Sequence, residues 1–263
     1  MEIINEIHQR MKEYSVGCDY VPLKISIKVK PPIYLNNPFI HFDGLISYLC
    51  FREAVNELFY NLPTENTIDI SNLQLPIKQT NDVYHASVGI YGDNLRLYRD
   101  KLYKRFTDKE TYKLTKKQQK GKIKTNQGHF KDFMINMPML ITNHITFYAN
   151  ADKNEIKRLL HHLTHIGKKT SIGSGKIFKI TITETDEDYS FFKNGNIMRA
   201  IPSSFKLPIL PGMTFQKATY KPPYWDSTKA TMCIVPRNQI KEAILNGKNI
   251  EKRKCAGSSN KKI

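Results

Sequence analysis

The ten residues from Gly167 to Lys176, GKKTSIGSGK, combine a flexible backbone with cations and hydroxyl groups. Three glycines in this run can turn sharply and bring backbone N–H groups close to a ligand. Exposed N–H groups, hydroxyls and lysines together favour a bound phosphate, because all of them donate hydrogen bonds or carry positive charge. We therefore predict that the run contacts the backbone of a polynucleotide through Lys168, Lys169, Ser171, Gly173, Ser174, Gly175 and Lys176.

Two nucleotide-binding motifs can be tested against the same run, and both fail. A Walker A loop needs Ser or Thr after its Gly-Lys pair, but Ile177 follows Lys176, and Thr170 stands where the first glycine belongs. A dinucleotide fingerprint fails because Phe178 replaces the third glycine and the run follows a predicted helix. Nucleotide hydrolysis is therefore disfavoured, and an ordinary tight turn between a helix and a strand remains the alternative to polynucleotide binding.

Three histidines precede the glycine-rich run and form the main catalytic candidate. His161 and His165 are four residues apart, and His162 and His165 three, so one helix would place them on neighbouring positions. Such a set could bind zinc or supply a general acid and base. No Cys or carboxylate nearby completes a metal shell, so we predict no metal site. We expect structural or RNA-packing roles, with acid–base catalysis left open.

The charge of the chain is strongly positive, with 41 Lys and Arg against 24 Asp and Glu, a formal net charge of +17. Residues 96–131 hold thirteen cationic and three acidic side chains, a net charge of +10, together with five Tyr and Phe residues. Cations interleaved with rings suit phosphate contact and base stacking. A solvated helix face is the less favoured alternative for this segment. An amphipathic membrane helix needs a sustained apolar stripe that the segment lacks. The RNA-binding candidates here are Arg96, Arg99, Lys116, Lys117, Lys120, Lys122 and Lys124.

Composition excludes several other classes of protein. The apolar content of 40% supports a buried core, which excludes wholesale disorder. We expect no signal peptide, since the first residues mix charged and apolar types, and no window approaches the 18 to 20 apolar residues of a membrane span. The four cysteines at 18, 50, 233 and 255 are scattered, which disfavours a zinc ribbon or a disulfide framework. These features predict a soluble, cytoplasmic protein with reduced thiols and no cofactor.

Periodicity predicts an α+β fold with ferredoxin-like units. Residues 21–30 alternate apolar and basic side chains and are expected to form a strand, as are 83–91, 141–148 and 177–183. One helix is expected from about Asp43, taken as its N-cap, and another from Asp152 to Gly167, with Glu155 completing a capping box. We predict one domain over 1–240, with a basic insertion at about 96–131, and a basic, partly disordered tail over 241–263.

Several segments together resemble a known family. Residues 145–180, a predicted strand, helix, glycine-rich loop and strand, are similar to the signature of CRISPR-associated RAMP proteins. The segments His41–Leu45 (HFDGL), Arg199–Pro202 (RAIP) and Pro222–Trp225 (PPYW) resemble elements of the type IV RAMP subunit of the Cas five class. The resemblance covers most of residues 21–235, although Ala200 after Arg199 departs from the pattern and the lysine-rich insertion is not a motif that aligns with the family.

This resemblance implies a noncatalytic subunit of a guide RNA (crRNA) effector complex in antiviral defence. Such a subunit caps the five-prime handle of the crRNA and contacts the backbone RAMP subunits and a large-subunit-like protein; target DNA near the protospacer-adjacent motif is a further partner to consider. The implied fold is a ferredoxin-like (RRM-like) domain with an inserted thumb. The resemblance adds His41, Arg199, Tyr224 and Trp225 to the RNA-binding candidates, with burial of His41 at the helix start as its alternative. A RAMP endoribonuclease using a histidine as general acid or base is the competing function.

Overall fold

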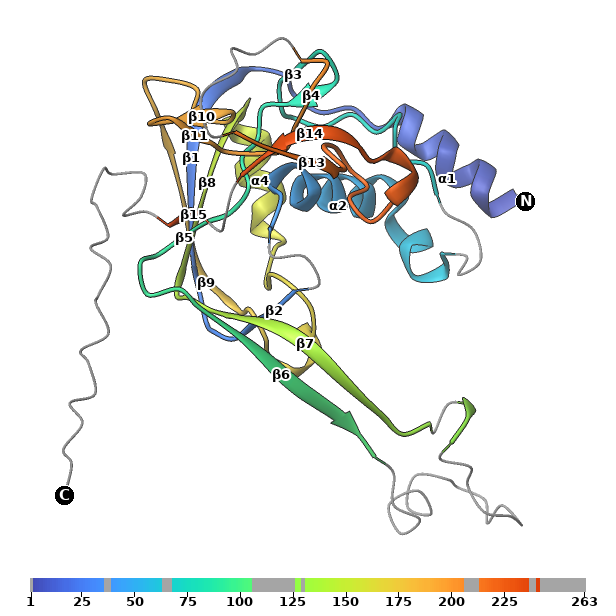
Figure 1. Ribbon diagram of the computed structural model, residues 1–263. Helices are drawn as coiled ribbons and strands as arrows, with labels where there is room; N and C mark the ends of the chain where they lie inside the picture. The colour runs from blue at the N-terminus through green and yellow to red at the C-terminus, as the bar shows by residue number, and fades with distance from the viewer. Residues whose placement is uncertain are drawn as a thin grey trace, which may run out of the picture.

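A computed structural model describes residues 2–35, 39–62, 68–105, 126–128, 131–205, 213–236 and 240–241. The chain has a mixed α+β architecture in which most strands pair antiparallel (Figure 1). Among the helices of these residues, none is long and apolar enough to span a membrane. The described cysteines, Cys18, Cys50 and Cys233, are free thiols.

The central sheet has five strands in the order β15-β5-β8-β1-β9. Their bounds are Tyr20–Val29 for β1, Ile90–Tyr91 for β5, His144–Asp152 for β8, Ile177–Glu184 for β9 and Ile240–Lys241 for β15. The alternation predicted for residues 21–30 is confirmed, because Leu23, Ile25, Ile27 and Val29 point into the core. All pairs are antiparallel except β15 with β5.

Helices α2 (Phe42–Val55) and α4 (Lys153–His161) contact each other, and both pack against the apolar side of this sheet (Figure 1). Helix α1 (Glu2–Glu13) adds Ile7 and Met11 to the same core and packs against α2. The chain order β1-α2-β5-β8-α4-β9, with β1 between β8 and β9, is compatible with a ferredoxin-like fold.

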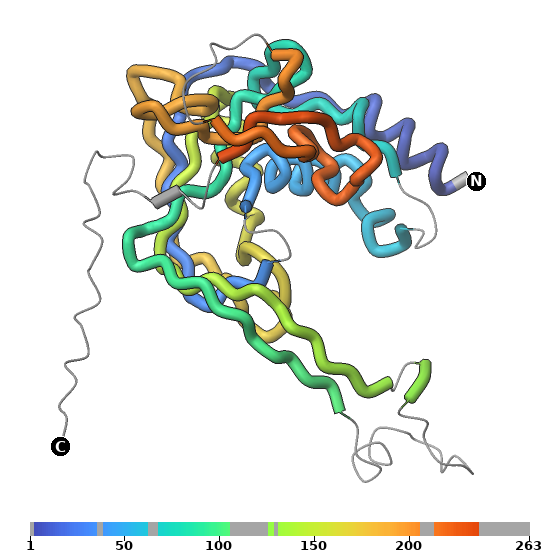
Figure 2. The backbone as a smooth tube through the Cα atoms, viewed as in Figure 1, coloured from blue at the N-terminus to red at the C-terminus, as the bar shows by residue number. Residues whose placement is uncertain are grey.

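A long hairpin leaves the central sheet between β5 and β8. Strands β6 (Arg96–Lys104) and β7 (Phe133–Ile141) pair along nine positions and extend away from the rest of the molecule (Figures 1 and 2). The short strand β2 (Ile33–Tyr34) pairs with β7 at the base of this hairpin. The first residues of the predicted basic insertion are therefore a β-strand, whereas most of the insertion, 106–125, lies outside the described residues.

A second, smaller region contributes short strands near the start of α2. Strand β14 (Thr231–Val235) lies between β12 (Ile201–Pro202) and β13 (Thr214–Ala218), with η4 (Ser227–Lys229) just before it. Two hairpins accompany it: β3 (Gln79–Thr80) with β4 (Val83–Tyr84), and β10 (Phe192–Lys193) with β11 (Asn196–Ile197). The described residues also form two other short helices, η1 (Asn56–Asn61) and η3 (Thr170–Ile172).

Two predicted strands have different bounds in the structure. The expected strand 83–91 is two short pieces, β4 and β5, joined by residues that make single bridges to other segments. The expected strand 141–148 is the end of β7 and the start of β8, because the chain turns at Thr142, whose hydroxyl donates to the carbonyl oxygen of His144 at 3.0 Å. The turn could not be predicted from hydrophobic periodicity, because apolar residues occur on both sides of it.

The two predicted helix starts had opposite outcomes. Asp152 is the N-cap of α4 and accepts from the backbone N–H groups of Asn154 and Glu155, as predicted. The capping box predicted with Glu155 does not form, because the Glu155 carboxylate accepts from Arg158 and the backbone N–H of Asp152 donates to the carbonyl oxygen of Pro76. The N-cap of α2 is His41 rather than Asp43, because the Asp43 side chain turns inward to a buried cation.

Candidate nucleic-acid interface

Strand β2 joins the glycine-rich run to the base of the β6–β7 hairpin. Its residue Tyr34 pairs with Met139 of β7, and its carbonyl oxygen accepts from the backbone N–H of Lys168 at 2.7 Å. The backbone N–H of Gly175 donates to the carbonyl oxygen of Pro32 at 2.9 Å. Strand β2 therefore lies between the glycine-rich run and strand β7 of the hairpin, and connects two segments of the chain that are both predicted to bind RNA.

Two glycines of the run are required by this packing. Both Gly167 and Gly175 have positive φ angles, +91° and +63°. A Cβ atom at Gly175 would lie 1.9 Å from the carbonyl oxygen of Ile166, and one at Gly167 would lie 2.7 Å from that of Tyr34. Gly173 also has a positive φ, +83°, but a Cβ atom there would meet nothing within 4 Å. A ligand could therefore approach the backbone closely at Gly173. At Gly167 and Gly175 the space beside the backbone is already filled by other residues of the protein.

The structure corrects the prediction for Ser174 and Gly175. The Ser174 side chain is buried, and its hydroxyl donates to the carbonyl oxygen of Pro32 at 2.9 Å. It also accepts from the backbone N–H of Tyr34. Both residues are therefore occupied in fixing the loop to β2 and cannot contact RNA in this conformation. Among the RNA contacts predicted in the run, Lys168, Ser171, Gly173 and Lys176 are exposed, and Lys169 is half-buried in a left-handed conformation.

The hairpin presents cations and rings near this loop. Arg96, Arg99 and Lys101 on β6 are exposed, and so are the rings of Tyr98 and Tyr103 on the same strand. The side chain of Arg105 lies over the ring of Tyr103, 5.6 Å from its centroid. The predicted RNA contacts at Lys116, Lys117, Lys120, Lys122 and Lys124 lie outside the described residues.

One acidic side chain ties the hairpin to β2. The hydroxyl of Tyr34 donates to Oδ2 of Asp100 at 2.5 Å, and this hydrogen bond raises the pKa of Tyr34. The bond adds a side-chain contact between β2 and β6 to the backbone pairing of both strands with β7.

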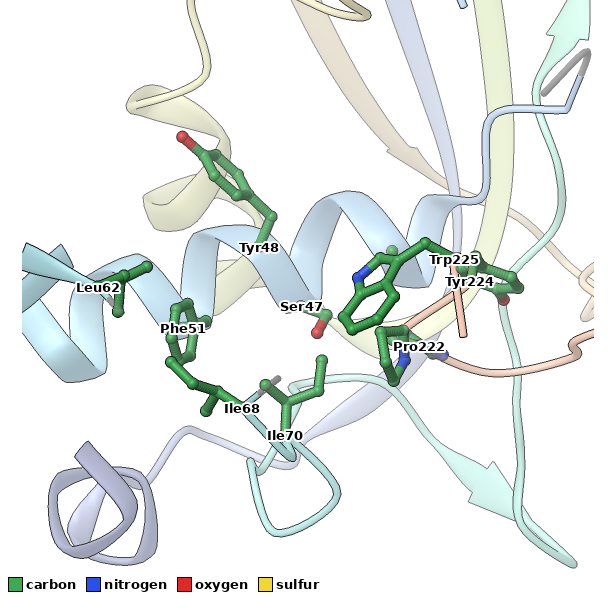
Figure 3. A pocket seen from close by; sticks show the side chains of 11 residues that line it. Ser47, Tyr48, Phe51, Leu62, Ile68, Ile70, Pro222, Tyr224 and Trp225 are labelled. Carbon is green, nitrogen blue, oxygen red and sulfur yellow. The ribbon is translucent and has the colours of Figure 1, made fainter. Parts of the chain in front are cut away.

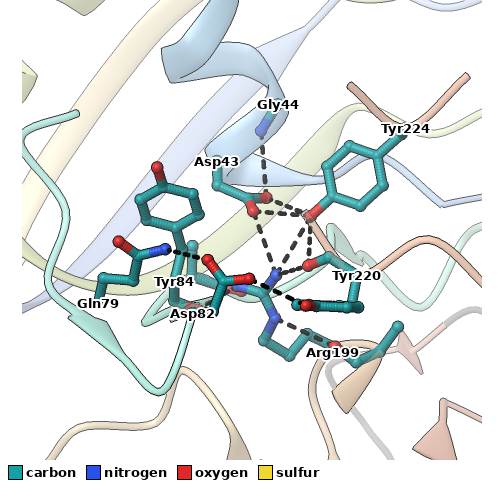
Figure 4. Close-up of polar contacts among 10 residues, drawn as sticks. Asp43, Gly44, Gln79, Asp82, Tyr84, Arg199, Tyr220 and Tyr224 are labelled. Carbon is teal, nitrogen blue, oxygen red and sulfur yellow. Dashed lines mark hydrogen bonds and ion pairs between the residues drawn. The ribbon is translucent and has the colours of Figure 1, made fainter. Parts of the chain in front are cut away.

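Arg199 belongs to a separate, buried network, which corrects its assignment to RNA contact. Its side chain is 1% exposed and forms an ion pair with Asp43, itself 1% exposed, at 3.1 Å (Figure 4). The same guanidinium donates to the carbonyl oxygens of Tyr84, Ala86 and Tyr220. Although burial opposes it, the charge of Asp43 raises the pKa of Arg199. This arginine joins α2 to the C-terminal strands and has no surface to offer RNA.

Tyr224 and His41 extend this network toward the surface. The Tyr224 hydroxyl donates to the Asp43 carboxylate at 2.7 Å, and burial together with the Asp43 charge raises its pKa well above the usual range. The imidazole of His41 stacks on the Tyr224 ring with centroids 3.7 Å apart and planes 12° apart. Burial lowers the pKa of His41 to about 4, so this side chain is neutral at physiological pH and offers phosphate no charge.

His41 is half-buried at the start of α2, which agrees with the alternative to RNA contact, with one difference from that prediction. The predicted hydrogen bond from its imidazole to the helix start does not form: His41 makes no side-chain capping bond, and its ring is held by stacking instead. Trp225, in contrast, is 66% exposed and is the one member of this group whose aromatic face is open to a ligand.

The histidine triad predicted on one helix is wrong. Helix α4 ends at His161, His162 is its C-cap, and His165 forms a bridge with Lys176. The backbone N–H of Ile166 donates to the carbonyl oxygen of Gly175, so the chain here pairs with the glycine-rich run instead of continuing the helix. Within the described ranges, no group of three His, Cys, Asp or Glu side chains is placed to hold a metal ion.

Two features of the site could not be predicted from the sequence: strand β2 and the ion pair between Arg199 and Asp43. Strand β2 has only two residues, too few for any periodic signal, and its place is set by pairing with distant segments. The partner of Arg199 was also missed, because Asp43 at the start of a helix looks like a cap. The HFDGL and PPYW segments that carried the resemblance do meet in space, through Asp43 and Tyr224.

A comparison with protein families gives a match over most of the chain. The family described as CRISPR type IV associated protein Csf3 matches residues 21–236. This range includes the glycine-rich run, the hairpin and the buried network. No curated protein matches the chain significantly.

Proposed function

This chain belongs to the Csf3 family of CRISPR type IV associated proteins, and on that premise we propose that it is the RNA-binding subunit of a type IV effector ribonucleoprotein. In this proposal it acts in the cytoplasm and caps the five-prime handle of the crRNA. It contacts the backbone RAMP subunit and a large-subunit-like protein in the same particle. It binds the guide RNA without cutting it.

The observation that carries this proposal is the contact between the glycine-rich run and the hairpin base through β2. Exposed Lys168 and Lys176 lie on one side of this junction, and Arg96 and Arg99 lie on the other. A single strand needs cations along its backbone and flat surfaces for its bases, and Tyr98 offers such a surface beside these cations. The net charge of +17 supports a polyanionic partner independently.

A paired charge-removal experiment tests this proposal. The double variant R99A/K168A removes one exposed cation from each side of the junction. The control K12A/K157A makes the same change in net charge on α1 and α4, where both lysines are exposed. Binding of a labelled single-stranded RNA carrying the repeat-derived handle is measured by fluorescence anisotropy over a range of salt concentrations.

We expect the slope of log affinity against log salt to fall by about 1.4 in R99A/K168A, because each lost phosphate contact lowers it by roughly 0.7 for single strands. The control should keep the wild-type slope. Equal slopes in the two double variants would show that the junction is not the RNA contact. A wild-type protein that does not bind the RNA would contradict the proposed function itself.

A further inference from the structure

Trp225 is an exposed ring next to a neighbour that the protein holds rigidly. Tyr224 is fixed at its hydroxyl by Asp43 and Arg199 and across its ring by His41. A Cβ atom at Gly44 would lie 3.2 Å from the Tyr224 ring, so α2 passes close to that ring where it has no side chain. The backbone that carries Trp225 is therefore anchored one residue away, although its own indole is 66% exposed.

Two cavities of similar size meet at this indole. The apolar cavity, of about 540 Å³, is lined by Ser47, Tyr48 and Phe51 of α2 and by Ile70, Pro222 and Trp225 (Figure 3). The mixed cavity, of about 530 Å³, is lined by Phe39, His41, Gln216, Lys217, Ser227 and Trp225. The lining of the apolar cavity is mostly apolar, with hydroxyls only from side chains such as Ser47 and Tyr48, whereas the mixed cavity combines rings with an amide, a hydroxyl and a cation.

The mixed cavity has the chemistry of a nucleobase site. A nucleobase has two apolar faces and a polar edge, so it needs a ring to stack on and donors or acceptors at its rim. Trp225 supplies the ring, and the exposed Gln216 and Ser227 supply rim groups. Lys217 is also exposed, and it has no ion-pair partner among the described residues, so it is available to a phosphate.

We infer that Trp225 and the mixed cavity bind one unpaired nucleobase, stacked on the indole with its polar edge toward Gln216 and Ser227. This inference rests on the proposed RNA binding and adds a second contact, away from β2, that grips a base rather than the sugar-phosphate backbone. The strongly positive charge of the chain favours a nucleic acid over an apolar protein segment at this surface. An apolar side chain from a protein partner would instead prefer the apolar cavity.

The sequence offers a direct probe of this site, because Trp225 is the only tryptophan in the chain. Stacking of a base on an indole quenches its fluorescence, so Trp225 emission reports contact at this residue alone. The full-length protein is titrated with single-stranded RNA and, separately, with an abasic ribose-phosphate oligomer of the same length. We expect saturable quenching by the RNA, with the same midpoint as the anisotropy of labelled RNA, and none by the abasic oligomer.

Variants test the same contact without relying on fluorescence. W225A should weaken RNA binding about 5-fold to about 150-fold, the range for loss of one stacked base, whereas W225F keeps a ring and should bind more tightly than W225A. Tyr60→Ala removes another exposed ring, in η1 beyond the C-terminal end of α2, and should bind like wild type. Circular dichroism and a thermal melt confirm that each variant is folded.

The outcomes separate this inference from the proposed function. RNA binding by anisotropy with unchanged Trp225 emission and wild-type affinity in W225A would overturn the inference alone, leaving this surface to a protein subunit. Quenching by the abasic oligomer as well would also overturn it, since no base would be needed. No binding of RNA in either assay would overturn both.

Discussion

At the scale of single residues, the buried ion pair between Asp43 and Arg199 is the contact whose loss we expect to destabilise the fold strongly. Both side chains are almost fully buried, and Arg199 reaches backbone oxygens from two segments besides. A buried ion pair adds little net stability compared with an apolar pair, but removing one partner leaves a charge without compensation. The pair therefore specifies how α2 and the C-terminal strands fit together.

We expect Arg199→Met to lower the free energy of unfolding by about 3 to 5 kcal/mol, because it leaves the Asp43 carboxylate buried and unpaired. Urea denaturation followed by circular dichroism measures this loss. Lys153→Ala breaks the exposed pair with Glu184 and serves as the control, with an expected loss of about 0 to 1 kcal/mol. Similar losses in the two variants would contradict the central role of the buried pair.

His41 makes the stability of this region depend on pH. Its pKa is lowered to about 4 by burial, whereas an unfolded histidine titrates near 6.5. Between these values the unfolded chain takes up a proton that the folded protein does not, so stability falls as the pH falls through this range. From pH 7.5 to pH 5 we expect a loss of about 2 kcal/mol from this residue.

The variant His41→Phe keeps a ring for stacking on Tyr224 and removes the titrating group. The difference in unfolding free energy between pH 7.5 and pH 5, measured in urea, should shrink by about 2 kcal/mol in this variant. A pH dependence equal to that of wild type would mean that His41 is protonated equally easily in both states. The comparison does not require the variant to be as stable as wild type, because only the change with pH is used.

At the scale of elements, the two inner glycines of the loop should behave differently. Gly175→Ala places a methyl group against the Ile166 carbonyl, so we expect a loss of about 3 kcal/mol or more in unfolding free energy. Gly173→Ala meets open space and should cost only about 1 to 2 kcal/mol for its positive φ. Thermal or urea denaturation of both variants distinguishes the two positions; equal losses would show that the loop can move away from Ile166.

Elements with a repeated pattern were predictable, and elements defined by distant partners were not. Strands β1 and β9 and the buried stripe Ile156, Leu159 and Leu160 follow their sequence periods. Helix α4 was predicted too long because its apolar spacing continues past His161, while the chain there pairs with the glycine-rich run. The same distant pairing explains why β2 and the break within residues 83–91 had no local signal.

The candidate site shows the same limit. Charge and ring content identified the hairpin and the loop as candidates, since these are properties of composition. Which members face solvent depends on packing, so Ser174 and Arg199 could not be separated from exposed Lys168 and Arg99 by residue type. Tyr224 and Trp225 are adjacent in sequence, yet the hydroxyl of Tyr224 is fixed in the buried network and the indole of Trp225 is exposed.

At the scale of the whole molecule, binding without cleavage is the behaviour that separates the two candidate functions. Purified protein incubated with unprocessed repeat RNA should give no specific cut. The triple variant H161A/H162A/H165A should bind mature guide RNA within several-fold of wild type. Loss of a true acid–base group costs about 10² to 10⁴ in rate, so site-specific cleavage that disappears in the triple variant would establish the nuclease instead.

The outer part of the β6–β7 hairpin makes no strand pairing with the central sheet, so we expect its length to have little effect on the stability of the core. Past Asp100 and Met137 its two strands pair only with each other, and nine strand residues span about 30 Å. Because Asp100 and Met137 face each other across the ladder, an Asn-Gly turn could join them directly and remove residues 101–136. The shortened protein should melt within a few degrees of wild type, because β2 and the Tyr34–Asp100 bond remain. The distance that the hairpin reaches from the core can therefore be lengthened by insertions or shortened by deletions, one residue pair at a time, while the fold stays the same.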